Sequence, residues 1–230
     1  MNRAKNLFEE KAKGFDNIIP LIIPFYNEIY NIVIDSIPFQ KQSSIKILDI
    51  GCGTGTLAGI IKRQFPLSRI TCVDFAKNMI EVAKIKLNEF KNDIDFFVGD
   101  FNKYKPDEKY DVIVSCFALH HIATDEKKVQ LYKNIFNSLN NNGIFITADI
   151  VLGANNHIEN LNFKKWKEFL NKHFSQEIIE NELLPKYQAD DNPSTLFNHY
   201  KWLNNTGFEE IETVWKSYNF VIFGGRKLGK

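Results

Sequence analysis

The sequence carries almost no net charge, because 29 lysines and arginines stand against 28 aspartates and glutamates, a formal charge of +1 over 230 residues. Proteins that bind a phosphate backbone usually carry a basic surplus, since neutralising the phosphates supplies most of their non-specific affinity. The near-neutral charge therefore predicts that nucleic acid is not the partner. One basic run without acids, residues 215–230, keeps an RNA partner open as an alternative.

Cysteine and long apolar runs are scarce as well. The three cysteines, Cys52, Cys72 and Cys116, form no C-x-x-C pair and are odd in number, so a disulfide framework is not expected and a reducing compartment is. The longest apolar run, residues 18–26, is interrupted by two prolines and is far shorter than the ~20 residues of a membrane helix. Residues 1–5 hold charges where a secretory signal would be apolar. These absences predict a cytoplasmic protein without a membrane partner.

Short apolar segments alternate with helical patterns along most of the chain, which predicts a doubly wound α/β fold with helices on both faces of a mostly parallel seven-stranded sheet. The last two expected strands are joined by a short turn, so we expect them to pair antiparallel, and the turn Asn140-Asn141-Asn142-Gly143 is expected before the fifth strand. The expected strands are 45–50, 69–74, 94–98, 110–116, 144–150, 208–215 and 218–223, and the expected helices are 56–65, 77–90, 125–139 and 193–206.

The clearest local signal is residues 49–55, Asp-Ile-Gly-Cys-Gly-Thr-Gly, between the first expected strand and the first expected helix. Glycines there permit a tight turn and let a ligand approach bare backbone amides, beyond the carboxyl ends of parallel strands. Gly53, Gly55 and Ala58 match a dinucleotide-binding fingerprint formally, but the match starts two residues late relative to the strand end and is weak evidence for such a site. No Walker lysine follows the loop, which argues against a P-loop nucleotide site. The loop predicts a bound cofactor, with the acid Asp49 two residues before its first glycine.

Four segments at expected strand ends together resemble the class I S-adenosylmethionine-dependent methyltransferases, over most of the chain. Residues 49–55 match the first motif of that family, and Asp74 matches the acid that binds the ribose hydroxyls, since a carboxylate can accept two donors side by side. Asp100 and Phe101 match the residues beside the adenine, and residues 115–121 match the segment that frames the methyl-transfer site. The resemblance implies a Rossmann-like methyltransferase fold, S-adenosylmethionine as cofactor and S-adenosylhomocysteine as product.

The resemblance also implies a domain plan and a cofactor site. Residues 1–230 form one domain, with a helical N-terminal cap (1–40), a cofactor-binding core (41–152), a helical insertion or lid (153–192), and a last helix with a C-terminal β-hairpin (193–230). For Met79, core packing is an equal alternative to cofactor contact, and Asp49 acts either directly or through the geometry of the loop. The implied cofactor residues are Tyr26, Asp49, Gly51, Cys52, Gly53, Gly55, Asp74, Phe75, Met79, Asp100, Phe101, Cys116 and Phe117.

More narrowly, the chain is similar to the carboxy-S-adenosylmethionine synthase family and its methyltransferase relatives. Residues 23–26, the fourth-strand segment and residues 207–220 carry this likeness, which makes Tyr26 a cofactor contact and implies a homodimer. Members that use the carboxylated cofactor have an arginine directly before the leucine of the penultimate helix, where this chain has Trp202 before Leu203. A tryptophan cannot replace a bidentate guanidinium, so the sequence favours plain S-adenosylmethionine.

His120 and His121 follow the fourth strand, at the expected methyl-transfer site. Their functional interpretation is a general base or an acceptor-orienting group, and the structural alternative is a helix start with one ring hydrogen-bonded. Displacement at a sulfonium methyl depends largely on positioning, and it needs a base only when the nucleophile arrives protonated. Adjacent residues rarely direct both side chains at one metal ion, and no H-x-x-x-H or H-E-x-x-H pattern occurs, so no metal is expected.

An apolar helical face runs through residues 163–170, and it either packs in the core or walls a substrate pocket. Trp166 and Tyr187 are the expected acceptor contacts. The predicted function is transfer of the sulfonium methyl, in line, to a nucleophilic atom of a small-molecule acceptor. The alternatives are a tRNA-modification enzyme of the carboxy-S-adenosylmethionine type and a non-catalytic cofactor-binding regulator.

Overall fold

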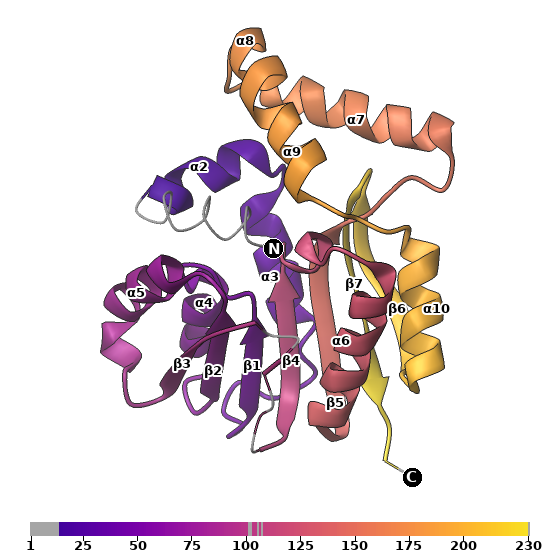
Figure 1. Cartoon of the computed structure of the whole chain (residues 1–230). Helices are drawn as coiled ribbons and strands as arrows, with labels where there is room; N and C mark the ends of the chain where they lie inside the picture. The colour runs from indigo at the N-terminus through magenta and orange to yellow at the C-terminus, as the bar shows by residue number, and fades with distance from the viewer. Residues whose placement is uncertain (1–13, 101–102, 105, 107, 230) are drawn as a thin grey trace.

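The computed structural model describes residues 14–100, 103–104, 106 and 108–229. One seven-stranded sheet runs through its centre in the order β3-β2-β1-β4-β5-β7-β6 (Figure 1). Strands β1 to β5 are parallel, and β7 runs antiparallel to both of its neighbours, so the predicted fold class is confirmed. The strands are β1 (Lys46–Ile50), β2 (Arg69–Asp74), β3 (Ile94–Val98), β4 (Tyr110–Cys116), β5 (Leu139–Ile150), β6 (Glu209–Ser217) and β7 (Phe220–Lys227).

Helices cover both faces of the sheet, which is why the central strands are buried almost throughout. Successive residues of β1 point to opposite faces, so Ile47 packs in the core under α3, α4 and α5 while Leu48 packs in the core under α6 and α10. The helices are α3 (Tyr26–Asp35), α4 (Thr56–Gln64), α5 (Lys77–Lys86), α6 (Asp125–Ser138) and α10 (Leu196–Thr206), with the 3₁₀ turns η2 (Asn88–Phe90) and η3 (Leu119–His121).

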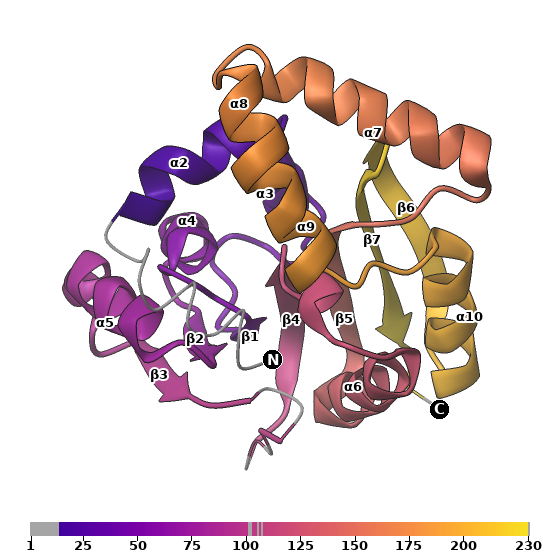
Figure 2. The same cartoon turned by 45° about the horizontal axis from the view of Figure 1, so that its top comes forward.

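The remaining helices lie beyond the carboxyl ends of the parallel strands, across the end of the sheet that comes forward in Figure 2. They are α2 (Phe15–Ile22), α7 (Asn156–Leu170), α8 (Gln176–Ile178), the π-helical turn η4 (Ile179–Leu183) and α9 (Leu184–Asp190). The indole Nε1 of Trp166 donates to the backbone carbonyl of Ile22 at 2.9 Å, which ties α7 to α2. Among the described helices, none alone is long and apolar enough to cross a membrane, and only α2 and α3 together reach that length and composition, with a 93° bend between them.

Several element boundaries differ from the sequence prediction, and three of the differences concern the fifth strand, the second helix and the last helix. The turn expected at residues 140–143 falls within β5, which begins at Leu139 opposite Tyr110 of β4. The β4–β5 register is irregular between Tyr110 and Val112, and Asn142 has a left-handed backbone with φ of +64°, so a local turn-like distortion remains inside the strand. The helix expected over 77–90 stops at Lys86 and is followed by the separate turn η2. The last helix starts at Leu196, after a Thr195 cap, and ends at Gly207 as predicted, where φ is +110°.

Candidate functional site

A cavity of about 250 Å³ lies at the carboxyl ends of the parallel strands, where the sheet order reverses between β1 and β4. The loops after β1, β2 and β4 form its floor, and α2 with the α7–α9 segment (residues 156–190) covers it. Most of the residues predicted from the sequence line this one cavity. They are Tyr26, Gly51, Cys52, Gly53, Asp74, Phe75, Met79, Cys116, Phe117, His120, His121, Trp166 and Tyr187.

The three glycines of the loop after β1 all have left-handed backbones, but for different reasons. A Cβ on Gly51 would collide with Ala118, so this glycine lets the loops after β1 and β4 touch. Gly55 packs against Ala83 and Leu87 of the α5 region and does not line the cavity. At Gly53, φ is +53° and a Cβ would meet nothing within 4 Å, so the backbone is bare toward the cavity.

Asp74, the last residue of β2, fixes that loop. Its Oδ2 accepts a hydrogen bond from the Gly53 amide at 2.9 Å and its Oδ1 accepts one from the Ala76 amide at 2.8 Å. Burial raises the pKa of this carboxyl group, although the two backbone donors oppose the shift. The carboxylate is therefore oriented by the backbone on both oxygens and lines the cavity with its remaining lone pairs.

Asp49 lies beneath the cavity floor and not in its lining. Within the described part of the chain, its Oδ2 is buried and has no hydrogen-bond partner. Burial, together with the charge of Asp74, raises the pKa of Asp49 to about 7. A buried carboxylate without a partner is unfavourable unless a cation approaches it. Asp49 and Asp74 therefore fit a ligand that carries positive charge, as a sulfonium amino acid does.

Tyr26 begins α3 and places its ring against the cavity. Its hydroxyl donates to the hydroxyl of Tyr30 at 2.9 Å, and its ring stacks at 6.3 Å from the ring of Phe117. Burial raises the pKa of Tyr26 to about 12, so the phenol stays neutral at physiological pH. Tyr26 thus contributes a neutral aromatic wall with one polar atom.

Only part of the cover over the cavity was predicted from the sequence. Helix α2 turns an apolar face with i, i+3, i+4 and i+7 spacing toward the cavity, made of Phe15, Ile18, Ile19 and Ile22. No α2 residue is fully buried by protein, and Ile18 is 44% exposed. The spacing was available as a signal, but nothing in the sequence shows what the face packs against.

A hydrogen-bonded cluster fastens α2 to the glycine loop. Asp16 accepts from the Thr54 hydroxyl at 2.5 Å and from the Thr56 hydroxyl at 3.1 Å, and it pairs with the Lys86 ammonium at 2.6 Å. Sequence reasoning missed Asp16, because its partners lie 38 to 70 positions away along the chain.

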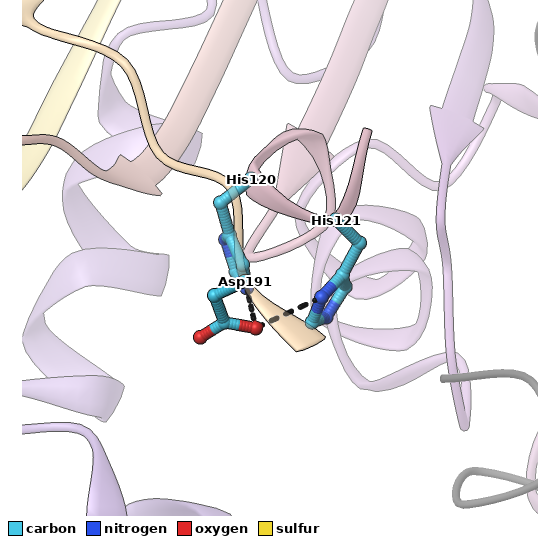
Figure 3. Close-up of side chains that lie close together, drawn as sticks. All are labelled: His120, His121 and Asp191. Carbon is cyan, nitrogen blue, oxygen red and sulfur yellow. Dashed lines mark ion pairs between the residues drawn. The ribbon is translucent and has the colours of Figure 1, made fainter. Parts of the chain in front are cut away.

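His120 and His121 come together with two acids that the sequence analysis did not single out, Asp149 and Asp191, and Figure 3 shows the second of them beside the two rings. His120 Nδ1 is hydrogen-bonded to Oδ1 of Asp149, and its Nε2 lies 3.7 Å from Oδ1 of Asp191. His121 Nδ1 lies 3.0 Å from the same Asp191 oxygen. Burial lowers the pKa of His120, but the two carboxylates outweigh it and raise that pKa to about 9.

The two adjacent histidines are thus one of the rare pairs whose side chains approach one point. The tight 3₁₀ turn η3 brings the two ring centroids to 4.1 Å, and both rings approach Asp191. A signal for Asp149 was present, since an acid in the mostly apolar second half of β5 needs a buried partner. No local pattern marked Asp191, which arrives from the end of α9.

Besides Asp49 and Gly55, one predicted cofactor residue is absent from the cavity lining and another cannot be placed. Asp100 follows β3 and is not part of the cavity lining, and Phe101 lies outside the described residues. Trp202 points its ring at Tyr132 and His199, in the core between α6 and α10, also away from the cavity. Conversely, Lys186 of α9 lines the cavity although nothing in the sequence singled it out.

The cysteines are free and buried, as expected from the absence of a disulfide framework. Cys52 and Cys116 line the cavity, while Cys72 lies inside β2. Burial raises the pKa of the Cys52 and Cys116 thiols well above the ordinary value, so neither is a reactive thiolate.

Comparisons with known proteins find similarity to methyltransferases and to a related synthase. The family described as "Methyltransferase domain" matches residues 47–143. The carboxy-S-adenosyl-L-methionine synthase of Nautilia profundicola is 30% identical over 219 residues, which cover 94% of this chain and 91% of that enzyme. Human N-acetylserotonin methyltransferase, solved with S-adenosylmethionine, has a TM-score of 0.65 at 18% identity and covers 99% of this chain and 57% of its own. A chain in the complex of the Haloferax volcanii Trm112 activator with a methyltransferase reaches a TM-score of 0.69 at 14% identity, over 96% of this chain and 98% of its own.

Proposed function

Because the chain belongs to the class I S-adenosylmethionine-dependent methyltransferases, we propose that it transfers the methyl group of S-adenosylmethionine to a nucleophilic atom of a small-molecule acceptor. The observation that carries this proposal is the covered cavity with Gly53 and Asp74 on its floor and an apolar wall opposite them. When bound, the cofactor supplies an electrophilic methyl group on a sulfonium, which a lone pair of the acceptor displaces in line.

In this proposal the floor holds the cofactor. Asp74 accepts the ribose hydroxyls, because its two oxygens are already oriented by backbone donors and keep free lone pairs. Gly53 allows the cofactor to approach the backbone, and the charge of Asp49 beneath the floor stabilises the cationic amino-acid end. Phe75 and Met79 line the same end of the cavity and would flank the adenine.

The opposite wall selects the acceptor. The apolar face of α2, with Trp166 and Tyr187 of the α7–α9 segment, excludes water and favours a largely apolar molecule. His120 and His121 stay the predicted acceptor-facing polar groups. The volume of about 250 Å³ must be shared with a cofactor, which favours a small acceptor.

The charge distribution supports a small acceptor over RNA. In the C-terminal basic run, the Lys227 ammonium donates to the carbonyls of Phe136 and Leu139, and Arg226 pairs with Glu210 at 3.4 Å. Since β7 is antiparallel, this end of it lies at the amino ends of the parallel strands, away from the cavity (Figure 1). These two basic side chains therefore serve the fold at a distance from the site.

One observation favours a second function, carboxylation of the cofactor as in the Nautilia profundicola relative, which matches 94% of this chain. A carboxylated cofactor needs a cation for its extra carboxylate. Trp202 cannot serve, because it packs between α6 and α10. Lys186 is the one lysine or arginine among the described residues that line the cavity, so it is the candidate cation for this alternative.

Product analysis separates the two functions. The protein is incubated with methyl-labelled S-adenosylmethionine and fractionated small-molecule extract, and the products are identified by mass spectrometry. Methyl transfer predicts S-adenosylhomocysteine together with a labelled small molecule. A cofactor that gains the mass of one carboxyl group would establish the second function, and label recovered in RNA would overturn the small-molecule acceptor. The homodimer implied by the family resemblance is tested separately by sedimentation.

A further inference from the structure

A cluster of candidate metal ligands lies in the cavity lining, where the α7–α9 segment returns to the sheet. We propose that His120, His121 and Asp191 together bind one divalent transition-metal ion. Their candidate ligand atoms, one from each residue, lie within 4.8 Å of one another. All three residues also line the cavity, so the ion would face the space in which the acceptor binds.

The separations between the ligand atoms fit a common ion. Two ligands at about 2.0–2.1 Å from a tetrahedral ion lie roughly 3.3 Å apart, and at an octahedral ion somewhat closer. Asp191 Oδ1 is 3.0 Å from His121 Nδ1 and 3.7 Å from His120 Nε2. In Figure 3 this one oxygen faces both rings, so an ion can take the central position with small side-chain adjustments.

His120, the first proposed ligand, is oriented by a buried hydrogen-bond partner. His120 Nδ1 is hydrogen-bonded to Asp149, whose side chain is 1% exposed, and this directs Nε2 toward Asp191. A buried carboxylate behind a histidine is the usual arrangement behind a metal-binding imidazole, since it fixes the tautomer and raises the basicity of the ligand nitrogen. The pair His120 and Asp149 therefore resembles the support of a metal ligand and not an isolated ion pair on a surface.

The third ligand is also held in place. The backbone amide of Asn192 donates to the His120 carbonyl at 2.6 Å, which fixes the residue next to Asp191. The buried Lys128 ammonium donates to the Asn192 carbonyl and, at 2.7 Å, to the hydroxyl of Ser194. The chain segment that delivers Asp191 is thus bound to the same turn that delivers the two histidines.

The donor set selects the kind of ion. Two imidazoles and one carboxylate suit zinc, iron(II), cobalt or manganese, whereas calcium and magnesium prefer oxygen donors alone. The carboxylates of Asp149 and Asp191 together offset the charge of a divalent ion. Three protein ligands leave at least one coordination position open toward the cavity, as in metal sites that bind a substrate.

The role of the ion rests on the proposed function: an oxygen or nitrogen atom of the acceptor occupies the open position, which orients its lone pair toward the cofactor. The ion also joins the end of α9 to η3, because Asp191 follows α9 and the histidines belong to η3. A metal would therefore hold the cover closed over a bound acceptor.

The test measures metal binding directly, with the full-length chain freed of any histidine tag. Cobalt(II) is titrated into the metal-free protein, and its visible absorption reports coordination by nitrogen and oxygen. We expect one equivalent to bind, and zinc(II) to displace it. Asp191→Asn and His121→Ala should each weaken cobalt binding by about 100-fold or more, and Asp149→Asn by roughly 10–100-fold through loss of the supporting hydrogen bond.

His157→Ala is the matched control, because this exposed histidine on α7 is not one of the proposed ligands, and it should leave cobalt binding unchanged. Circular dichroism and S-adenosylhomocysteine binding verify that each variant is folded. Absent cobalt binding in the wild type, or equal binding by wild type, Asp191→Asn and His121→Ala, would overturn the metal site and leave an ion-paired cluster. Cobalt binding without S-adenosylhomocysteine binding would instead reject the proposed function and keep the metal site.

Discussion

Replacing Asp49 by asparagine tests whether the loop acid is an unfavourable buried charge kept for a cationic ligand. The substitution keeps the size of the side chain and removes its charge. The carboxyl pKa is raised from 3.8 to about 7, so ionising the folded protein is unfavourable by about three pKa units, or roughly 4 kcal/mol. A raised pKa contributes stability that is complete below the unfolded pKa and is lost as the pH rises through the folded pKa.

The variant should therefore gain stability over the wild type as the pH rises. Between about pH 5 and about pH 8.5 the advantage of Asp49→Asn should grow by roughly 2–3 kcal/mol, since about two pKa units of that interval lie below the folded pKa. Urea unfolding of the ligand-free protein at the two pH values measures this difference. Asp95→Asn, at an exposed side chain, is the control and should change stability little at either pH.

The same substitution should weaken binding of S-adenosylmethionine, because the positive charge of the ligand loses its buried counter-charge. Stability and binding thus change in opposite directions. A stability difference that stays constant between the two pH values would show that Asp49 is not an ionisable group of raised pKa, and unchanged cofactor affinity would remove it from the site.

Three further substitutions test the floor and the cover. Gly53→Ala should place a methyl group in the cavity and weaken S-adenosylhomocysteine binding at least about 10-fold by calorimetry. The left-handed backbone adds only about 1–2 kcal/mol of folding strain. An unchanged affinity would refute the close approach of the cofactor to this backbone. Asp16→Ala should speed cofactor dissociation in stopped-flow experiments by releasing α2 from Thr54, Thr56 and Lys86, and an unchanged rate would show that α2 does not retain the ligand. Trp166→Phe should lower the free energy of unfolding by about 1 kcal/mol through loss of the bond to the Ile22 carbonyl, measured by urea unfolding, and no change would mean that water replaces the bond.

The centre of the sheet was predictable because its strands are buried on both faces. Arg69–Asp74 and Tyr110–Cys116 are mostly apolar runs, and their bounds matched the prediction. The turn predicted before the fifth strand lies within β5, and the local preference of its asparagines and glycine persists there as an irregular register and a left-handed Asn142. The strand partners Tyr110 of Leu139 and Lys227 of Gly143 lie 29 and 84 positions away, and no local pattern reveals them.

The site residues were likewise predictable where a local pattern marks them and not where they depend on distant contacts. Gly53 and Asp74 were predictable because the loop after a parallel strand must meet the ligand, and the structure places both at the cavity. Asp149 and Asp191 depend on contacts 29 and 71 residues from His120, and the sequence analysis did not connect them. Asp49 illustrates a third case, in which the residue type was noted while its position beneath the floor required the structure.

The central claim is that the cavity binds S-adenosylmethionine with Asp74 as its anchor. Calorimetric titration with S-adenosylhomocysteine tests it most directly, on the wild type, on Asp74→Ala, and on the exposed control Asp95→Ala. We expect one site per chain, affinity in the control equal to the wild type, and a loss of about 100-fold or more in Asp74→Ala, since two hydrogen bonds to a charged group disappear. No binding by the wild type, or equal affinity in Asp74→Ala, would contradict it.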